Sequence, residues 1–274
     1  MLFSFVVSAA LGYHITDLFE TDSSFDEFDS ALDIIKREGF SGVELNLSFA
    51  EPDTLARIGD AITQKGLRLA AVGTGLVYVR GGLSFTDADS AKRNKAVEIV
   101  NGLIQFAGRE HAVAVIGMVR GNPTVDSTAI KFLHQSVIAC DQTASEHKTH
   151  IALEAINRYE TSLLNTASEV TKLIQEHSLH STGILLDTFH MNIEESSIEA
   201  SIRKNFERIS HFHIADSNRW PPGRGHLRVE RLLKLLDELG YNGWVSAEVL
   251  PQPDNSGAVE DTANFLKRQG YMKH

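Results

Sequence analysis

The sequence predicts an α/β fold, a single (β/α)8 barrel that spans residues 1–274. Three observations support this prediction. Short strand-like runs alternate with longer helical patterns along the chain, the runs number eight, and no G-x-G-x-x-G or Walker loop follows any of them. The length of 274 residues, with 42% hydrophobic residues, can bury one large core, and no linker or low-complexity tract indicates a second domain.

The first predicted strand lies in the opening segment MLFSFVVSAALGYH. This segment lacks the basic start of a signal peptide, and its apolar part has the length of a buried strand. The other strands are similar short runs. In chain order, the predicted strands are Leu2 to Val7, Gly42 to Leu47, Arg68 to Val72, Ala112 to Met118, Ile151 to Glu154, Gly183 to Leu186, Ile209 to Ile214 and Trp244 to Glu248.

The segments between the strands have helical patterns of apolar residues. The clearest predicted helices are Ala88 to Phe106, Ser127 to Ser145 and Val229 to Leu239. Glycines that end helices are expected where a helical stretch gives way to the next strand, at Gly39, Gly66 and Gly240.

The net charge of −10 disfavours a nucleic-acid partner, because such a surface repels a phosphate backbone. Cys140 is the only cysteine, so the chain forms no internal disulfide, which fits a reducing compartment. No apolar run approaches the ~20 residues needed to cross a bilayer. We therefore expect a cytoplasmic protein that binds neither nucleic acid nor membrane.

Polar residues close several strands in the second half of the chain. These residues are Glu154 in IALE, Asp187 in GILLD, His213 in HFHIAD and Glu248 in WVSAE. Their separations of 33, 26 and 35 residues are close to the ~31 residues per unit of an eight-unit barrel, so the side chains should meet at one mouth. Three carboxylates and one imidazole favour Mn2+, with Mg2+ or Co2+ as alternatives, over a thiolate-seeking metal.

Each of these four residues has a plainer interpretation when taken alone. An Asp after a strand is often a helix N-cap, a Glu at a strand end is often at the surface, and a His in a strand is often part of the core. Four in succession at barrel spacing are better explained by a cation, because a cation offsets the desolvation of carboxylates beside apolar strands. The sequence therefore predicts a metal centre.

Further polar residues lie close to these positions. His211 should point to the same side of its strand as the ligand histidine but one layer deeper, so we expect it to be structural. His190 and Arg219 should lie at the mouth and hold an oxygen where negative charge develops, unless they are ordinary surface residues. Glu160 is either an acceptor for a substrate hydroxyl or a solvated loop acid. The segment WPPGRGH, from Trp220 to His226, is predicted to be a loop on the same rim.

Four longer motifs cover the fifth to eighth strands: LEAINRYETSLLNT, GILLDTFHMNIEE, HFHIADSNR and VSAEVLP. Through them the chain resembles the D-tagatose 3-epimerase group of the xylose-isomerase-like TIM barrel superfamily. The first half of the chain matches less strongly. Within the group, AVGTG, GGLSFT, IGMVRG, SNRWPPGRGH and EVLPQPD are most similar to the 5-keto-L-gluconate epimerases of inositol catabolism.

This resemblance implies a metal-dependent sugar epimerase. The implied ligands of Mn2+ or a similar ion are Glu154, Asp187, His213 and Glu248, and the implied contacts to substrate oxygens are Glu160, His190 and Arg219. Glu154 and Glu248 would exchange the substrate proton through a cis-enediolate, one removing it beside the ketone and the other returning one from the opposite face. This inverts the carbon and needs no organic cofactor. The expected substrate is a small keto sugar or keto sugar acid, with 5-keto-L-gluconate, giving D-tagaturonate, as first choice.

A keto acid needs a counter-charge for its carboxylate. Arg120, just past the fourth strand in VIGMVRG, is the candidate for a clamp with two hydrogen bonds, the alternative being a loop arginine paired with a surface acid. A neutral ketose such as D-tagatose, D-psicose or L-ribulose would instead need apolar and hydroxyl-bearing walls. Val7, Ser8, Gly73 and Thr74, at the ends of the first and third strands, are expected to line the pocket whether the substrate is a keto acid or a neutral ketose. His14, in the first loop, departs from the keto-gluconate pattern and either alters the pocket or is exposed.

Other functions are compatible with the same fold. An apurinic-site endonuclease should have extra His and Asp ligands and a basic rim, and the acidic balance argues against it. Hydroxypyruvate isomerase shares the enediolate chemistry and differs mainly in substrate size. A non-catalytic sugar-binding barrel is disfavoured because both proton-transfer glutamates are present. The family also suggests a homo-oligomer, either a dimer or a tetramer.

Overall fold

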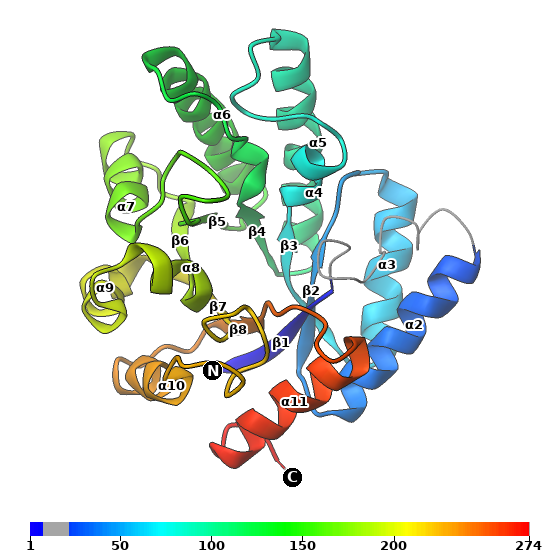
Figure 1. Cartoon of the computed structure of the whole chain (residues 1–274). Helices are drawn as coiled ribbons and strands as arrows, with labels where there is room; N and C mark the ends of the chain where they lie inside the picture. Colours follow the sequence, from blue (N-terminus) through cyan, green and yellow to red (C-terminus); the bar gives the residue numbers. More distant parts are fainter. Residues whose placement is uncertain (8–21, 274) are drawn as a thin grey trace.

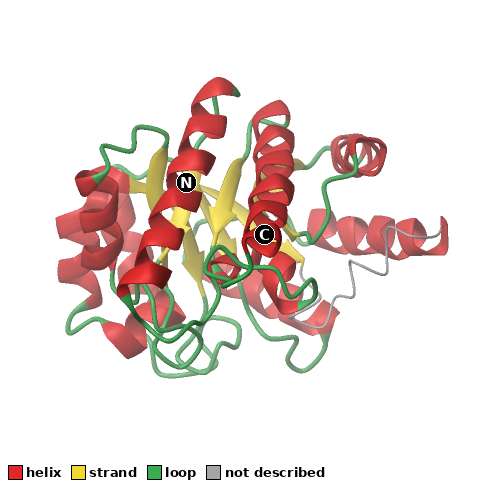
Figure 2. Ribbon diagram, turned by 90° about the horizontal axis from the view of Figure 1, so that it is seen from above, coloured by secondary structure: helices red, strands yellow, loops and turns green. Residues whose placement is uncertain are grey.

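The computed structural model describes residues 1–7 and 22–273 of the chain. Eight parallel strands form a closed barrel in the order β1-β2-β3-β4-β5-β6-β7-β8, and the helices lie around it (Figure 1 and Figure 2). Strand β1 pairs with both β2 and β8, which closes the barrel. The predicted (β/α)8 architecture is confirmed.

Strands and helices alternate along the chain as expected. The strands are β1 (Leu2–Val7), β2 (Gly42–Asn46), β3 (Arg68–Gly73), β4 (Val113–Ile116), β5 (Ile151–Glu154), β6 (Thr182–Asp187), β7 (Ile209–Ile214) and β8 (Trp244–Ala247). The helices are α2 (Asp22–Arg37), α3 (Pro52–Gln64), α4 (Gly75–Val79), α5 (Ser90–Arg109), α6 (Ser127–Glu146), α7 (Ala167–Glu176), α8 (Thr188–Glu194), α9 (Ile198–Asn205), α10 (Val229–Glu238) and α11 (Asn255–Arg268), with 3-10 turns η2 (Met118–Arg120) and η3 (Phe206–Arg208).

Helix ends follow the expected backbone chemistry. The glycines predicted to end helices have φ angles of 98°, 64° and 82° at Gly39, Gly66 and Gly240. These angles lie in the left-handed region, which glycine enters without a steric penalty, so the three predictions are confirmed. Among the described residues, none of the helices combines the length and the apolar composition needed to span a bilayer.

The fourth strand ends before the predicted Met118. Strand β4 stops at Ile116, and Gly117 leaves the strand conformation with φ −108° and ψ −113°. A Cβ atom at position 117 would lie only 2.5 Å from Oε2 of Glu154. Glycine at this position therefore allows the Glu154 carboxylate to approach the backbone, and β4 ends where that carboxylate lies.

The barrel interior has an apolar half and a polar half. The apolar half is a cluster on β3 to β6 that consists of Ala71, Val115, Ala152 and Leu185. The polar half comes from β1, β2, β7 and β8 and consists of the buried side chains of Ser4, Glu44, His211 and Ser246. Buried polar groups need partners, and these residues bond to one another, with 2.7 Å between the two serine hydroxyls and 2.9 Å from His211 Nε2 to Ser246 Oγ. This network forms a polar base beneath the carboxyl ends of these strands.

Candidate active site and metal centre

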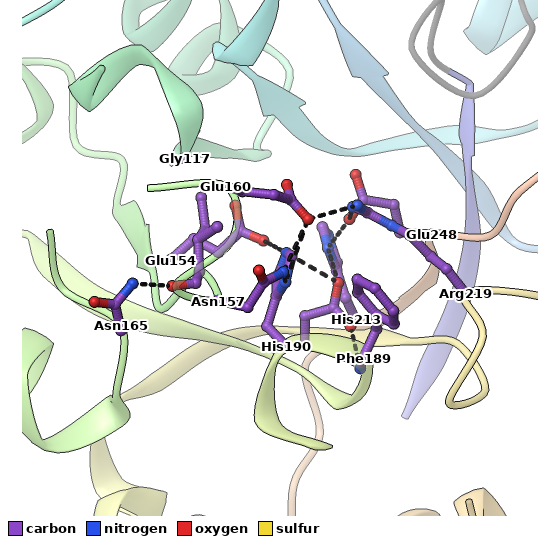
Figure 3. A network of polar contacts seen from close by, with 12 residues as sticks. Gly117, Glu154, Asn157, Glu160, Asn165, Phe189, His190, His213, Arg219 and Glu248 are labelled. Carbon is purple, nitrogen blue, oxygen red and sulfur yellow. Dashed lines mark hydrogen bonds and ion pairs between the residues drawn. The ribbon is translucent and has the colours of Figure 1, made fainter. Parts of the chain in front are cut away.

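The four predicted metal ligands lie together at the carboxyl end of the barrel. Glu154 ends β5, Asp187 ends β6, His213 lies near the end of β7, and Glu248 directly follows β8. One ligand atom from each residue lies within 4.8 Å of the others. In Figure 3, Glu154 and Glu248 lie on either side of this ligand cluster, with His190 and His213 between them.

Two buried atoms of the ligand cluster have no hydrogen-bond partner. Asp187 accepts from the backbone N–H of Phe189 with Oδ1 and so caps α8, but its Oδ2 has no partner, and neither has Nδ1 of His213. These two atoms lie 4.0 Å apart, and His213 Nδ1 is 3.3 Å from Oε2 of Glu248. A divalent cation would satisfy both atoms and offset the negative charge of the carboxylates. The donor set therefore fits a cation that prefers oxygen ligands.

Glu44, which the sequence analysis did not identify, orients His213 from below. Its carboxylate is buried within β2 and accepts from Nε2 of His213 at 3.0 Å and from Nε2 of His211 at 2.8 Å. Burial would raise the pKa of Glu44, but the two histidines lower it to about 2, so the group is ionised and can only accept. The proton of a neutral His213 therefore lies on Nε2, and the Nδ1 lone pair faces the other ligands. A charged residue inside the apolar run GVELN was the signal in the sequence.

Glu44→Gln is expected to weaken Mn2+ binding by about 10- to 100-fold, because an amide no longer enforces the His213 tautomer that can bind metal. Isothermal titration calorimetry measures the affinity, and activity should return at saturating Mn2+. Glu146→Gln, at an exposed position at the end of α6, is the matched control and should bind like the wild type. An unchanged affinity in Glu44→Gln would contradict the orienting role.

Burial and mutual repulsion separate the pKa values of the ligand cluster. Burial, together with Glu248, raises the pKa of Glu154 to about 8 and that of Asp187 to about 7. Burial would also raise the pKa of Glu248, but Arg219 and His213 hold it well below its usual value. Burial would lower the pKa of His213, but neighbouring carboxylates raise it well above its usual value. Below pH 7 the cluster without metal therefore retains protons on Glu154, Asp187 and His213.

Metal binding is expected to tighten as the pH rises from about 6 to about 9, because a cation must displace the ligand protons. The carboxyl pKa values of about 8 for Glu154 and about 7 for Asp187 are raised, so more protons have to leave at lower pH, and affinity falls as the pH falls. Calorimetry in two buffers of different ionisation enthalpy counts the released protons. An affinity that stays constant over this range would contradict the assignment of these ligands.

The residues expected to contact the substrate border the same cluster. His190 lies in α8, is 2% exposed, and places Nε2 at 3.5 Å from Oε1 of Glu154. Burial, and then the charge of Arg219, lowers its pKa to about 3, so the imidazole is neutral. Arg219 donates to Glu248 at 2.9 Å and to Glu160 at 3.3 Å (Figure 3). Neutral and charged N–H donors therefore lie next to the carboxylates.

The loop after β7 is organised around Asp216. This side chain accepts from the backbone N–H groups of Ser217, Gly223 and Leu227 at 2.7, 2.8 and 3.0 Å. The same loop holds Arg219 at φ 61°, a left-handed conformation that is uncommon for a non-glycine residue. The loop thus fixes the backbone at Arg219, and Glu160 and Glu248 hold the guanidinium.

Arg120 does not reach the cavity, and this corrects the prediction of a substrate clamp. Its side chain is fully buried, and its guanidinium donates to the backbone carbonyls of Ile116, Gly117, Glu154, Leu163 and Leu164. Burial lowers its pKa to about 10, so it stays charged at neutral pH. A guanidinium has five N–H donors, and backbone carbonyls engage all of them. Arg120 therefore joins turn η2 to the loop after β5, and no donor remains for a substrate carboxylate.

A cavity of about 220 Å³ lies above the ligand cluster. Its lining combines the charged side chains of the site with apolar side chains that include Leu76, Met118, Ile156 and Leu250. Of the residues expected to form its walls, Thr74 lines the cavity; Val7 and Gly73 are not part of its lining, and Ser8 and His14 lie outside the described residues. Gly73 shapes the cavity through Asn46, which does line it. A Cβ atom at position 73 would lie 1.8 Å from Oδ1 of Asn46, so only glycine leaves room for that side chain.

The family described as xylose isomerase-like TIM barrel matches residues 32–269. The chain belongs to this family. This chain is 29% identical over 242 residues to the 3-dehydro-D-guloside 4-epimerase of Escherichia coli (strain K12). The alignment covers 85% of this chain and 91% of that protein. The D-psicose 3-epimerase of Enterocloster bolteae is 38% identical over 102 residues, 37% of this chain and 34% of that one.

Solved structures share the fold. The D-psicose 3-epimerase from Clostridium cellulolyticum H10, in crystals with D-tagatose, shares the fold with a TM-score of 0.81 over 99% of both chains at 21% identity. The predicted membership of the D-tagatose 3-epimerase group, and of the isomerase class of enzymes, is confirmed by the named relatives of this xylose isomerase-like barrel.

Proposed function

We propose that this xylose isomerase-like barrel is a metal-dependent epimerase that inverts the carbon beside the ketone of a small keto sugar, with Mn2+ or a similar dication as cofactor. The observation that carries the proposal is the placement of Glu154 and Glu248 on opposite sides of one ligand cluster beneath a cavity (Figure 3). Relatives named as ketose and 3-dehydro-D-guloside epimerases support this class of reaction.

The charged and polar residues of the cavity would divide the reaction between them. A bound dication would supply positive charge for the oxygens that become negative when the C–H bond breaks. Glu248, kept ionised by Arg219, can take the proton from one face, and Glu154 can return one from the other. His190 donates a hydrogen bond to a substrate oxygen, and Glu160 accepts one from a hydroxyl. The carbon beside the ketone is inverted without any redox step.

The charges in the cavity favour a neutral substrate. Among the described residues that line it, Arg219 is the only Lys or Arg, and it already pairs with Glu160 and Glu248. Residues 8–21 contain no Lys or Arg in the sequence. A substrate carboxylate would therefore enter an acidic cavity without a free counter-charge. A neutral ketose is favoured over 5-keto-L-gluconate, which was the first choice from the sequence.

The test compares D-tagatose with D-tagaturonate. The two differ only at the terminal carbon farthest from the ketone, which is a hydroxymethyl group in D-tagatose and a carboxylate in D-tagaturonate. The Mn2+-loaded protein is offered each sugar in D2O, and NMR follows deuterium uptake at the carbon beside the ketone. We expect uptake and epimer formation from D-tagatose, with kcat/KM at least about 10-fold higher than for D-tagaturonate.

Other outcomes would change the proposal in different ways. Label that enters only D-tagaturonate would contradict the neutral substrate and return 5-keto-L-gluconate to first place. Turnover of hydroxypyruvate alone would indicate an isomerase with a smaller substrate. Sugar binding without any exchange would contradict catalysis and indicate a sugar-binding barrel.

A further inference from the structure

The loop after β5 carries Asn157, a buried polar side chain that is not one of the four residues of the ligand cluster. It is 1% exposed. Its Oδ1 accepts from the backbone N–H of Tyr159 at 2.9 Å, and its Nδ2 donates to Oε1 of Glu160 at 2.9 Å. Each partner has only one hydrogen-bonding role, since a backbone N–H donates and a carboxylate accepts. The orientation of the Asn157 amide is therefore fixed by its two partners.

A third contact of the same amide determines the tautomer of His190. Nδ2 of Asn157 lies 2.7 Å from Nδ1 of His190. Because the amide nitrogen can only donate, Nδ1 has to accept, and a neutral imidazole whose Nδ1 accepts carries its proton on Nε2. Nε2 lies 3.5 Å from Oε1 of Glu154 (Figure 3). The N–H group therefore lies beside the carboxylates at the base of the cavity.

We propose that Asn157 is a positioning residue that holds His190 as the Nε2–H tautomer, so that the imidazole donates to a substrate oxygen beside Glu154. The inference rests on the proposed function. The opposite tautomer would present a lone pair to an oxygen that gains negative charge, and the stabilising hydrogen bond would be lost. The second N–H of the amide restrains Glu160, which also accepts from Arg219. One amide thus orients two groups that face the substrate.

Asn157→Asp tests this inference, because a carboxylate accepts where the amide donates and so favours a proton on Nδ1 of His190. NMR of the ¹⁵N-labelled ring nitrogens reports the tautomer in the Mg2+-loaded protein, at about pH 8.5 so that the ring is neutral. His190→Gln identifies the His190 signals. We expect Nε2–H in the wild type, Nδ1–H in Asn157→Asp, and a kcat about 100-fold lower with KM changed by less than about 3-fold.

Asn157→Ala removes the donor without adding charge, and it keeps the inference testable if the Asp variant misfolds. We expect its kcat to fall about 10-fold with the metal affinity of the wild type. A purely structural role would lower the unfolding temperature and leave the kcat of the folded protein intact, which would overturn the inference.

The tautomer spectra give two further outcomes that overturn it. One is a protonated Nδ1 of His190 in the wild type, or an unprotonated Nδ1 in Asn157→Asp. The other is a changed tautomer in Asn157→Asp with an unaltered kcat. These spectra need no substrate, so a missing epimerase activity would count against the proposed function and leave the tautomer assignment in place.

Discussion

Glu154→Gln and Glu248→Gln are each expected to lower kcat at least about 1000-fold while the barrel stays folded. Each substitution removes the carboxylate that exchanges a proton on its face of the substrate, yet it keeps an oxygen at the ligand position. Because one of three negative charges is lost, metal binding also weakens, so kcat is measured with D-tagatose at saturating Mn2+. Circular dichroism melting checks the fold.

The two variants should differ in isotope exchange. The glutamate that faces the C–H group of D-tagatose is needed for any exchange from this sugar, whereas the other glutamate is needed only for return from the opposite face. One variant should therefore take up deuterium from D2O without forming the epimer, and the other should do neither. Glu146→Gln, exposed on α6, should keep the kcat of the wild type. A variant that retains a tenth of the wild-type kcat would contradict a mechanism with two glutamates.

The barrel could be predicted because strand and helix periodicity are local signals in the sequence. Leu2 to Val7, Ile151 to Glu154 and Ile209 to Ile214 match the observed strands at both ends. The fourth strand was predicted too long because its apolar run continues through Met118. The backbone leaves the strand at Gly117, where Glu154 approaches it, and a contact between residues so far apart leaves no local pattern.

The ligand cluster could be proposed from the sequence because the carboxyl ends of barrel strands share one rim. Residues that act through distant partners could not be found in this way. Glu44 orients a histidine that lies 169 positions later in the chain, and the proposed role of Asn157 depends on a histidine that lies 33 positions later. For Arg120, the motif VIGMVRG gives the charge and the position after a strand, but it does not show that turn η2 buries the guanidinium beneath the rim.

Arg120→Ala is expected to lower the free energy of unfolding by about 3–5 kcal/mol. The substitution leaves a cavity where a large side chain was fully buried, and it removes one donor from each of five backbone carbonyls, of which those of Gly117 and Leu164 keep a backbone N–H donor. Urea denaturation followed by circular dichroism measures the change. Because Glu154 offers one of these carbonyls, kcat of the remaining folded protein should also fall.

Arg224→Ala is the matched control for this prediction. Arg224 pairs with Asp261 at 2.7 Å on the surface, with 56% of its side chain exposed, so its loss should leave the free energy of unfolding almost unchanged, because water and salt screen an exposed ion pair. A substrate clamp at Arg120 would give a different pattern, since its loss would raise KM for D-tagaturonate without lowering stability. If Arg120→Ala were as stable as Arg224→Ala, the buried hydrogen bonds would contribute little to the free energy of unfolding. The hypothesis that Arg120 binds a substrate carboxylate would then have to be considered again. A large loss of stability, with the wild-type preference for D-tagatose over D-tagaturonate unchanged, would establish that Arg120 stabilises the packing of η2 against the loop that carries Asn157.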